Sequence, residues 1–181
     1  MPGPADTYVA YGLPWANASN TPFRRYKHWV HEGGIATPLI AHWPAGIPFE
    51  RSNQLDHQPA HLIDLMATCV DVGQAHYPET FEGTQITSRQ GVSLMPALLG
   101  QPLGRRQPLF WEHEGNRAVR DGKWKLVARG ADGPWELYYM DSDRTELYDR
   151  SQKHPERASA MARTWERWAV TAKVKPWPWD R

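Results

Sequence analysis

The stretch SNTPFRRYKHWVHEGGIATP, residues 19–38, decides the fold expected for this chain. Its first half has Pro22 where a helix begins and no helix-breaking residue through His31. Proline suits the first turn of a helix, so the sequence predicts a short helix over residues 23–31 that ends near Glu32.

The second half of this stretch predicts a turn followed by a strand. Gly33 and Gly34 stop the helix, because adjacent glycines permit positive φ and close approach of backbones. The run from Ile35 to Trp43 is almost continuously apolar, which is typical of a strand buried on both faces in the parallel sheet of an α/β core. Such a strand alone would leave both edges unpaired.

Composition bounds the remaining possibilities. The chain has 181 residues, 40% hydrophobic and 23% charged, which suits one medium domain, or one domain with a small appendage. A net charge of +1 predicts no nucleic-acid partner and no anionic membrane surface. No apolar run reaches the roughly 18 residues of a membrane span, and the first residues, MPGPADTY, do not resemble a signal peptide, so the compartment stays open. The single cysteine, Cys69, excludes an internal disulfide.

Two further helices are expected before residue 105. The segment from Ala60 to Val72 carries apolar residues at helical spacing and ends at Gly73, which predicts a helix. Its core-facing stripe would be Leu62, Leu65, Met66, Cys69 and Val70. Pro96 argues for a short helix that begins near it.

From residue 108 onward the pattern changes to that of an antiparallel sheet. Strands are predicted at 109–113 and 135–140, and a hairpin at 117–128 with a type I′ turn at Asp121-Gly122. Trp124 and Leu126 alternate with Lys123 and Lys125, which is typical of a half-buried sheet. A helix over 155–173 would lie across this sheet through Ala158, Met161, Ala162, Trp165, Trp168 and Ala169.

Three acidic or histidine-rich patterns are weak candidates for sites. His28, His31 and Glu32 would place two imidazoles about one helical turn apart, but zinc needs a third ligand and the order is not that of a metalloprotease. On a strand, Glu112 and Glu114 would share one face and His113 the other, so they should not converge. Asp141 and Asp143 lack calcium-loop spacing and predict a strand-ending turn.

The chain resembles the type I, formylglycine-dependent sulfatases of the alkaline phosphatase superfamily, and among them the arylsulfatases. The likeness covers roughly residues 8 to 176. It rests on ASNTPFRRYKHWVHEGGIATPLIAHWP at 18–44, HLIDLMATCVDVG at 61–73, GVSLMPALLG at 91–100, FWEHEGNRAVRDGKWKLVA at 110–128 and WELYYMDSDRTELYD at 135–149.

The resemblance implies an α/β fold of which this chain is the C-terminal part. Residues 1–105 are expected to belong to the catalytic α/β domain with an incomplete main sheet, and residues 106–181 to form a small antiparallel sheet packed with a terminal helix. The family's formylglycine motif, Cys-x-Pro-x-Arg or Ser-x-Pro-x-Arg, and its Asp-Asn calcium ligands do not occur here. Formylglycine and Ca²⁺ are therefore expected outside this chain, which holds no metal ligand, and the isolated chain is expected to be inactive.

Lys27 matches the lysine with which these sulfatases contact the substrate sulfate, five positions before Glu32 of the Glu-Gly-Gly turn. A fixed ammonium favours the charge that develops on sulfuryl oxygens in the transition state. His31, Glu32 and His113 are weaker candidates for substrate binding. The resemblance implies a sulfate-ester small molecule or sulfated glycan as substrate, with the missing N-terminal half as a partner. A noncatalytic fragment that binds a partner chain, or a phosphoesterase of the same superfamily, remain the alternatives.

Overall fold

The computed structural model describes residues 3–4, 6–7, 10 and 12–178. The chain forms two compact units, one made of Met1–Pro38 with Gln107–Arg181 and the other of Leu39–Arg106. The assignment of residues 1–105 and 106–181 to different domains of a larger enzyme stays a prediction.

The first unit is built on a four-stranded antiparallel sheet. Its strands, in the order β3-β4-β5-β6, are β3 (Leu109–His113), β4 (Asn116–Asp121), β5 (Trp124–Ala128) and β6 (Trp135–Tyr139). Asp121 pairs with Trp124, so Gly122 and Lys123 form the hairpin loop. The strands confirm the predictions. The predicted type I′ turn is wrong, because that turn needs positive φ at both loop residues, and of the two only Gly122 has it, at +55°.

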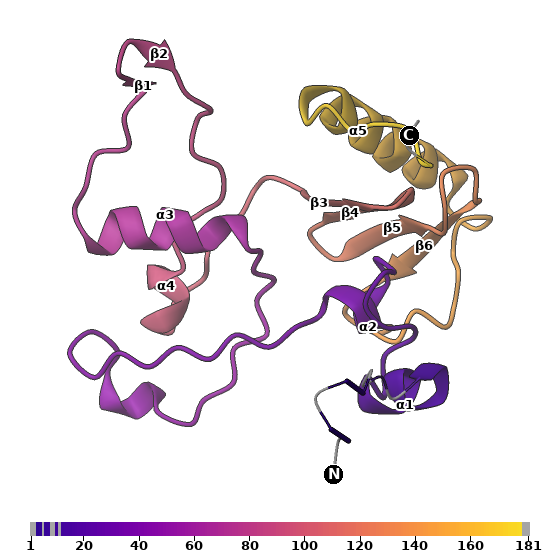
Figure 1. Ribbon diagram of the computed structural model, residues 1–181, viewed down its shortest axis with the longest axis horizontal. Coiled ribbons are helices and arrows are strands. Elements are labelled where there is room, and N and C mark those ends of the chain that lie inside the picture. The colour runs from indigo at the N-terminus through magenta and orange to yellow at the C-terminus, as the bar shows by residue number, and fades with distance from the viewer. Residues whose placement is uncertain (1–2, 5, 8–9, 11, 179–181) are drawn as a thin grey trace. The chain divides into compact units, whose positions relative to one another are not determined.

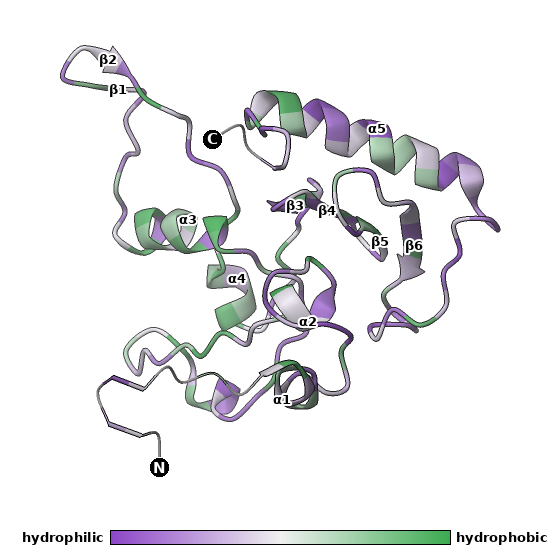
Figure 2. Ribbon diagram, turned by 45° about the vertical axis from the view of Figure 1, so that its right-hand side comes forward, coloured by the Kyte–Doolittle hydropathy of each residue, from purple (hydrophilic) through white to green (hydrophobic). Residues whose placement is uncertain are grey.

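Helix α5 (Pro155–Thr171) lies across one face of this sheet (Figure 1). Bands coloured for hydrophobic and hydrophilic residues alternate along its ribbon, as an amphipathic helix requires (Figure 2). The predicted stripe is confirmed, since it packs against the inward side chains of the strands. The buried members of this core are Val119, Leu126, Leu137, Ala158, Met161, Trp165 and Ala169.

The opposite face of the sheet is covered as well. Val30 and the half-buried Ile35 pack there against a second group of side chains, which comprises Ala118, Val127, Tyr138 and Met140. The prediction of a half-buried sheet is therefore wrong, because the segment before residue 38 folds back over this face. Lys125, which the alternating pattern placed on the solvent side, is fully buried.

The segment that covers this face is mostly irregular. The structure has short helices α1 (Gly12–Ser19) and α2 (Glu32–Ile35), with turns and bends between them, so the predicted helix over 23–31 is wrong. The two glycines allow close approach of backbones rather than positive φ. The Gly33 N–H donates to Arg24 O at 2.9 Å, and a Cβ at Gly34 would lie 1.8 Å from Trp29 O. A side chain at either position would prevent this packing.

The predicted strand from Ile35 to Trp43 is also wrong. Ile35 ends α2, and residues 36–43 adopt no regular secondary structure. Leu39 and Ile40 are exposed, Ile40 at 90% of its surface. A strand buried on both faces needs hydrogen-bonded neighbours, and none of the strands within the described residues pairs with this segment.

The second unit contains helices α3 (Ile63–Val72) and α4 (Met95–Leu98), the 3₁₀ turn η1 (Phe49–Arg51) and a hairpin of β1 (Thr80–Phe81) and β2 (Thr84–Gln85). Both helices confirm the predictions. The expected core stripe of α3 is wrong, because α3 buries Asp64 and Ala67 while Leu62 and Met66 are 77% and 57% exposed. None of the helices in the described part of the chain is long and apolar enough to cross a membrane.

Candidate functional site

A buried group of charges fixes the Glu-Gly-Gly turn beneath the sheet. Lys125 Nζ lies 2.9 Å from Glu32 Oε1 and 2.8 Å from Glu146 Oε1. The Glu32 backbone N–H, at the start of α2, donates to Glu146 Oε2 at 2.9 Å. Lys125 and Glu146 are fully buried, and Glu32 is 4% exposed. This triad ties the start of α2 to strand β5 and to the loop that follows β6.

The surrounding cations decide the charge of Glu32. Burial by itself would raise the pKa of its carboxyl, but the charge and hydrogen bond of Lys125, together with the charges of Arg120 and Arg144, outweigh burial and lower that pKa. Glu32 is therefore a carboxylate at neutral pH, and its lone pairs are engaged by Lys125. That environment suits anchoring of the turn.

His31 belongs to a second, partly buried group of side chains, centred on Glu136, which is 28% exposed. His31 Nε2 donates to Glu136 Oε2 at 3.3 Å, and the Tyr138 hydroxyl donates to the same oxygen at 2.6 Å. The hydrogen bond from His31 lowers the pKa of Glu136 to about 2. Tyr138 and Arg24 lower this pKa further, and together these contacts outweigh the effect of burial, which would raise it. Burial and the Glu136 carboxylate raise the pKa of Tyr138. His31 is 1% exposed, so it faces this carboxylate and not solvent.

The Glu136 carboxylate predicts a loss of stability in acid. Its pKa is lowered in the folded chain from 4.5 to about 2, so the unfolded chain binds the proton first as the pH falls. The stability it contributes is complete above pH 4.5, on the order of 3 kcal/mol at most, and is lost as the pH falls toward 2. Urea unfolding at pH 7, 4.5 and 3 should show this loss in the wild-type chain and a smaller loss in Glu136→Gln. Glu79→Gln, at an exposed position, should follow the wild type. An equal loss in Glu136→Gln and wild type would contradict the assignment.

Lys27 occupies a β-turn at the surface of the same unit. The turn is closed by the Trp29 N–H, which donates to Tyr26 O at 3.2 Å. Lys27 is exposed, and its amine forms no hydrogen bond or ion pair with any residue that the structure describes. The next residue, His28, takes φ of +96°, the conformation that glycine usually supplies at the third position of a type II turn. The turn is thus held in a conformation that costs energy for a side-chain-bearing residue.

His28 meets the loop between β3 and β4. Its Nδ1 lies 2.5 Å from Glu114 Oε2, and its ring lies 5.7 Å from the ring of His113, measured between centroids. The expectation that residues 112–114 cannot converge is wrong for His113 and Glu114. Glu114 follows the end of β3 and has φ of +50°, so the strand alternation no longer applies to it. Glu112 instead accepts the Gly115 N–H at 2.8 Å.

The four predicted site residues therefore fall into two environments. His31 and Glu32 are buried in separate ion groups, whereas Lys27 and His113 are exposed. His28 and His31 do not act as a pair, because they bond different carboxylates. Asp143 lies in the turn that follows β6, as predicted. Its carboxylate accepts hydrogen bonds from the backbone N–H groups of residues 147 and 148.

Sequence reasoning missed the supporting residues Lys125, Glu146 and Asn116. The sequence pattern predicts that Lys125 is exposed, because it alternates with apolar neighbours on a strand. Glu146 lies 114 residues from Glu32, and Asn116 lies 88 residues from His28. Such separations leave no local pattern that could reveal the pairings.

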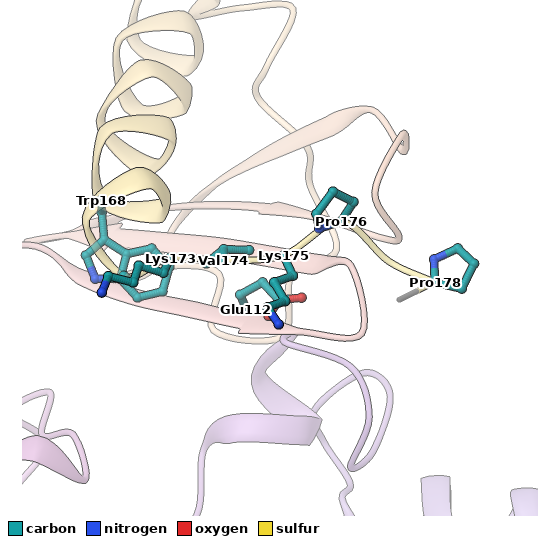
Figure 3. A pocket seen from close by; sticks show the side chains of 8 residues that line it. Glu112, Trp168, Lys173, Val174, Lys175, Pro176 and Pro178 are labelled. Atoms are coloured by element: carbon teal, nitrogen blue, oxygen red, sulfur yellow. The ribbon is translucent and has the colours of Figure 1, made fainter. Parts of the chain in front are cut away.

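A shallow pocket of about 800 Å³ opens beside the C-terminal end of α5. Its lining, shown in Figure 3, comprises Glu112, Trp168, Ala172, Lys173, Val174, Lys175, Pro176 and Pro178. Prolines and a tryptophan form its walls, and Glu112 is its one acidic lining residue. The Glu112 carboxylate already accepts the Gly115 N–H, so it holds the β3–β4 loop.

Comparison with known proteins relates the chain to sulfatases. It is 26% identical over 169 residues to an uncharacterised sulfatase of Schizosaccharomyces pombe, across 90% of this chain and 30% of that protein. It is 33% identical over 132 residues to N-acetylgalactosamine-6-sulfatase of Sus scrofa, across 72% of this chain and 23% of the enzyme. The chain is thus similar to sulfatases over most of its own length. It spans about a quarter to a third of the length of these relatives. No family model matches it.

Solved structures share the fold. The crystal structure of Ps i-CgsB superposes with a TM-score of 0.67 at 23% identity, over 82% of this chain and 32% of that one. The same protein in complex with k-i-k-neocarrahexaose gives a TM-score of 0.56 at 22% identity, over 71% and 27% of the two chains. The predicted fold class, a mixed α/β chain with an antiparallel sheet and a packed helix, is confirmed.

The residues that the structure describes do not fit the calcium ion expected from the resemblance to sulfatases. Within the described residues, His28, His113 and Glu114 are the one group of three His, Cys, Asp or Glu side chains close enough to share an ion. Two of its three ligands are nitrogens, whereas Ca²⁺ takes six to eight oxygen ligands.

Proposed function

We propose that this chain is the C-terminal portion of an arylsulfatase-like enzyme that hydrolyses sulfate esters, with Lys27 as a contact to the sulfate. The observation that carries the proposal is the placement of Lys27 on an exposed turn whose flanking segment is anchored by the Glu32 triad. An ammonium on a fixed turn can meet an anionic ester without the cost of ordering a flexible loop.

The chemistry of sulfate-ester cleavage explains the use of a lysine at this position. Charge develops on the sulfuryl oxygens and on the departing oxygen in the transition state, and a positioned cation favours that charge more than it favours the ground state. Lys27 would supply this stabilisation, and His113 would lie beside the substrate. The nucleophile, a formylglycine, and the calcium ligands would come from sequence outside this chain.

The substrate class that we propose is an aryl sulfate or a sulfated sugar. Arylsulfatase A of Homo sapiens, 32% identical over 105 residues, and the N-acetylgalactosamine-6-sulfatases support these two chemistries by their names. The chain covers only 18% and 23% of those enzymes, so specificity would depend largely on residues that lie elsewhere.

We further propose that sequence outside this chain covers the second unit. Several large apolar side chains there are strongly exposed, at 90% for Ile40, 86% for Phe49, 83% for Leu55, 77% for Leu62 and 57% for Met66. Exposed apolar side chains in such number are typical of a surface that another segment buries. The missing N-terminal half of the enzyme is the partner that this proposal requires.

Substitution of Lys27 tests the proposed role. In the complete enzyme that contains this chain, Lys27→Ala should lower kcat for 4-nitrophenyl sulfate about 10²- to 10³-fold, the loss measured when one charge-stabilising donor is removed. The thermal unfolding midpoint should stay unchanged, because Lys27 is exposed. Lys153→Ala, which removes another exposed lysine, is the matched control and should keep full activity.

Three results would contradict the proposal. Full activity in Lys27→Ala would remove the lysine from the site. Turnover of 4-nitrophenyl sulfate by the 181-residue chain alone would refute the assignment of the nucleophile to absent sequence. Faster hydrolysis of 4-nitrophenyl phosphate than of the sulfate by the complete enzyme would favour a phosphoesterase instead.

A further inference from the structure

The surface cluster of His28, His113 and Glu114 has the donor set of a transition-metal site. One ligand atom from each residue lies within 4.8 Å of the other two. The residues come from two places in the chain, the Tyr26–Trp29 turn and the loop between β3 and β4. Two imidazole nitrogens and one carboxylate oxygen are ligands that Zn²⁺ accepts, and three protein ligands leave its fourth position for water or an anion.

A single buried side chain holds the two parts of this cluster together. Asn116, 2% exposed, donates from Nδ2 to His28 O at 3.1 Å and to His113 O at 2.9 Å. Its Oδ1 accepts the Gly130 N–H at 3.0 Å, so the amide cannot turn without losing a third bond. The backbones that carry both imidazoles are therefore fixed relative to each other before any ion arrives.

Both loops adopt backbone conformations that bring these side chains together. His28 has φ of +96° and Glu114 has φ of +50°, in the region that residues other than glycine rarely adopt. Glu112 holds the second loop through the Gly115 N–H. Strain held in place by surrounding hydrogen bonds is common where side chains are positioned for binding.

The geometry allows an ion to enter with side-chain motion alone. Tetrahedral Zn²⁺ with bonds of about 2.0–2.1 Å places its ligand atoms roughly 3.3 Å apart. His28 and His113 are exposed and Glu114 is half-buried, so their side chains can rotate by the small amount needed. The His28–Glu114 ion pair shows that one carboxylate and one imidazole already meet.

We propose that His28, His113 and Glu114 form a binding site for a divalent transition metal, with Zn²⁺ as the best-suited ion. His28, one of the three residues of this site, follows Lys27 directly in the sequence, so a bound ion would add positive charge beside the lysine. The proposal stands on the cluster's own geometry and does not require that the chain be part of an enzyme.

Calorimetric titration of the full chain with zinc chloride tests this site. One Zn²⁺ should bind per chain, and the thermal unfolding midpoint should rise with Zn²⁺ concentration, because an ion that binds only the folded state stabilises it. His28→Ala, His113→Ala and Glu114→Gln should each weaken binding by about 100-fold or more, since loss of an outer-sphere partner alone costs 10- to 100-fold. His76→Ala, at an exposed histidine of the other unit, should bind as the wild type does.

The three substitutions lie at the surface, and circular dichroism in the absence of metal identifies any variant that fails to fold. Glu114→Gln keeps the shape of the side chain and serves as the second variant if either histidine variant unfolds. Absence of zinc binding by the wild-type chain would overturn the proposal. Binding that survives all three substitutions, or that is lost in His76→Ala, would also overturn it.

Discussion

Replacing Lys125 with methionine should lower the free energy of unfolding by about 3–5 kcal/mol, the cost of breaking a buried ion pair by removing one partner. Lys125 is fully buried between Glu32 and Glu146, with Nζ 2.9 and 2.8 Å from their carboxylates. Methionine keeps most of the volume but leaves two buried carboxylates without a cation. One of them must take up a proton or the turn must open to water.

Urea unfolding followed by tryptophan fluorescence measures this effect. Lys123→Met is the matched control, because Lys123 is two residues away on the same hairpin, 64% exposed and paired only at the surface with Asp141. It should change the unfolding free energy by less than about 1 kcal/mol. A Lys125→Met variant that unfolds at the wild-type urea concentration would exclude the triad as a stabilising group. The triple variant Lys125→Met with Glu32→Gln and Glu146→Gln should recover part of the loss, since no buried charge is then left unpaired.

Replacing Trp165 with alanine should cost a similar amount, about 3–5 kcal/mol. Trp165 is 7% exposed in the core between α5 and the sheet, and its Nε1 donates to Trp111 O at 3.0 Å. Its ring lies 6.0 Å from the ring of Trp135, and the Arg117 guanidinium lies 5.8 Å from it. Alanine would remove the indole, leave a cavity and take away the donor to a strand carbonyl.

The control for this substitution lies on the same helix. Val170→Ala, at a residue that is 81% exposed, should change the unfolding free energy by less than about 0.5 kcal/mol. Trp165→Phe should be intermediate, because it keeps an aromatic ring but not the hydrogen bond. Thermal and urea unfolding should show Val170→Ala as the most stable of the three variants, Trp165→Phe as intermediate and Trp165→Ala as the least stable. A Trp165→Ala variant as stable as the Val170→Ala control would show that α5 is not part of the cooperative core.

The C-terminal sheet and its helix could be predicted because their signals are local. The strands at residues 124–128 and 135–139 have alternating patterns of their own, and α5 has its own apolar stripe. The position of the turn at Gly122 and the short helix that contains Pro96 also follow from residues within a few positions. Periodic patterns of this kind depend on one face being buried, whichever partner buries it.

The N-terminal part could not be predicted, because its structure depends on distant partners. The run at residues 35–43 has the composition of a buried strand, yet strand formation requires neighbours to pair with. The residues before Glu32 have adequate helix propensity, but the contacts of Val30, His31 and Glu32 with the sheet dictate an irregular path. Of the candidate site, the sequence pointed to Lys27 and His113. The grouping of His28 with Glu114 depends on Asn116, whose bond to His28 spans 88 positions.

The Lys125 triad also constrains the order of events during synthesis of the protein. Glu32 is separated from Lys125 by 93 positions and from Glu146 by 114. A contact cannot form until the ribosome has made both residues, so the Glu-Gly-Gly segment emerges long before the groups that seat it. Contacts of such long range are also slow to form, because loop closure must come first. The segment that carries Lys27 therefore acquires its final conformation late, when the hairpin that contains Lys125 and the loop that contains Glu146 have left the exit tunnel.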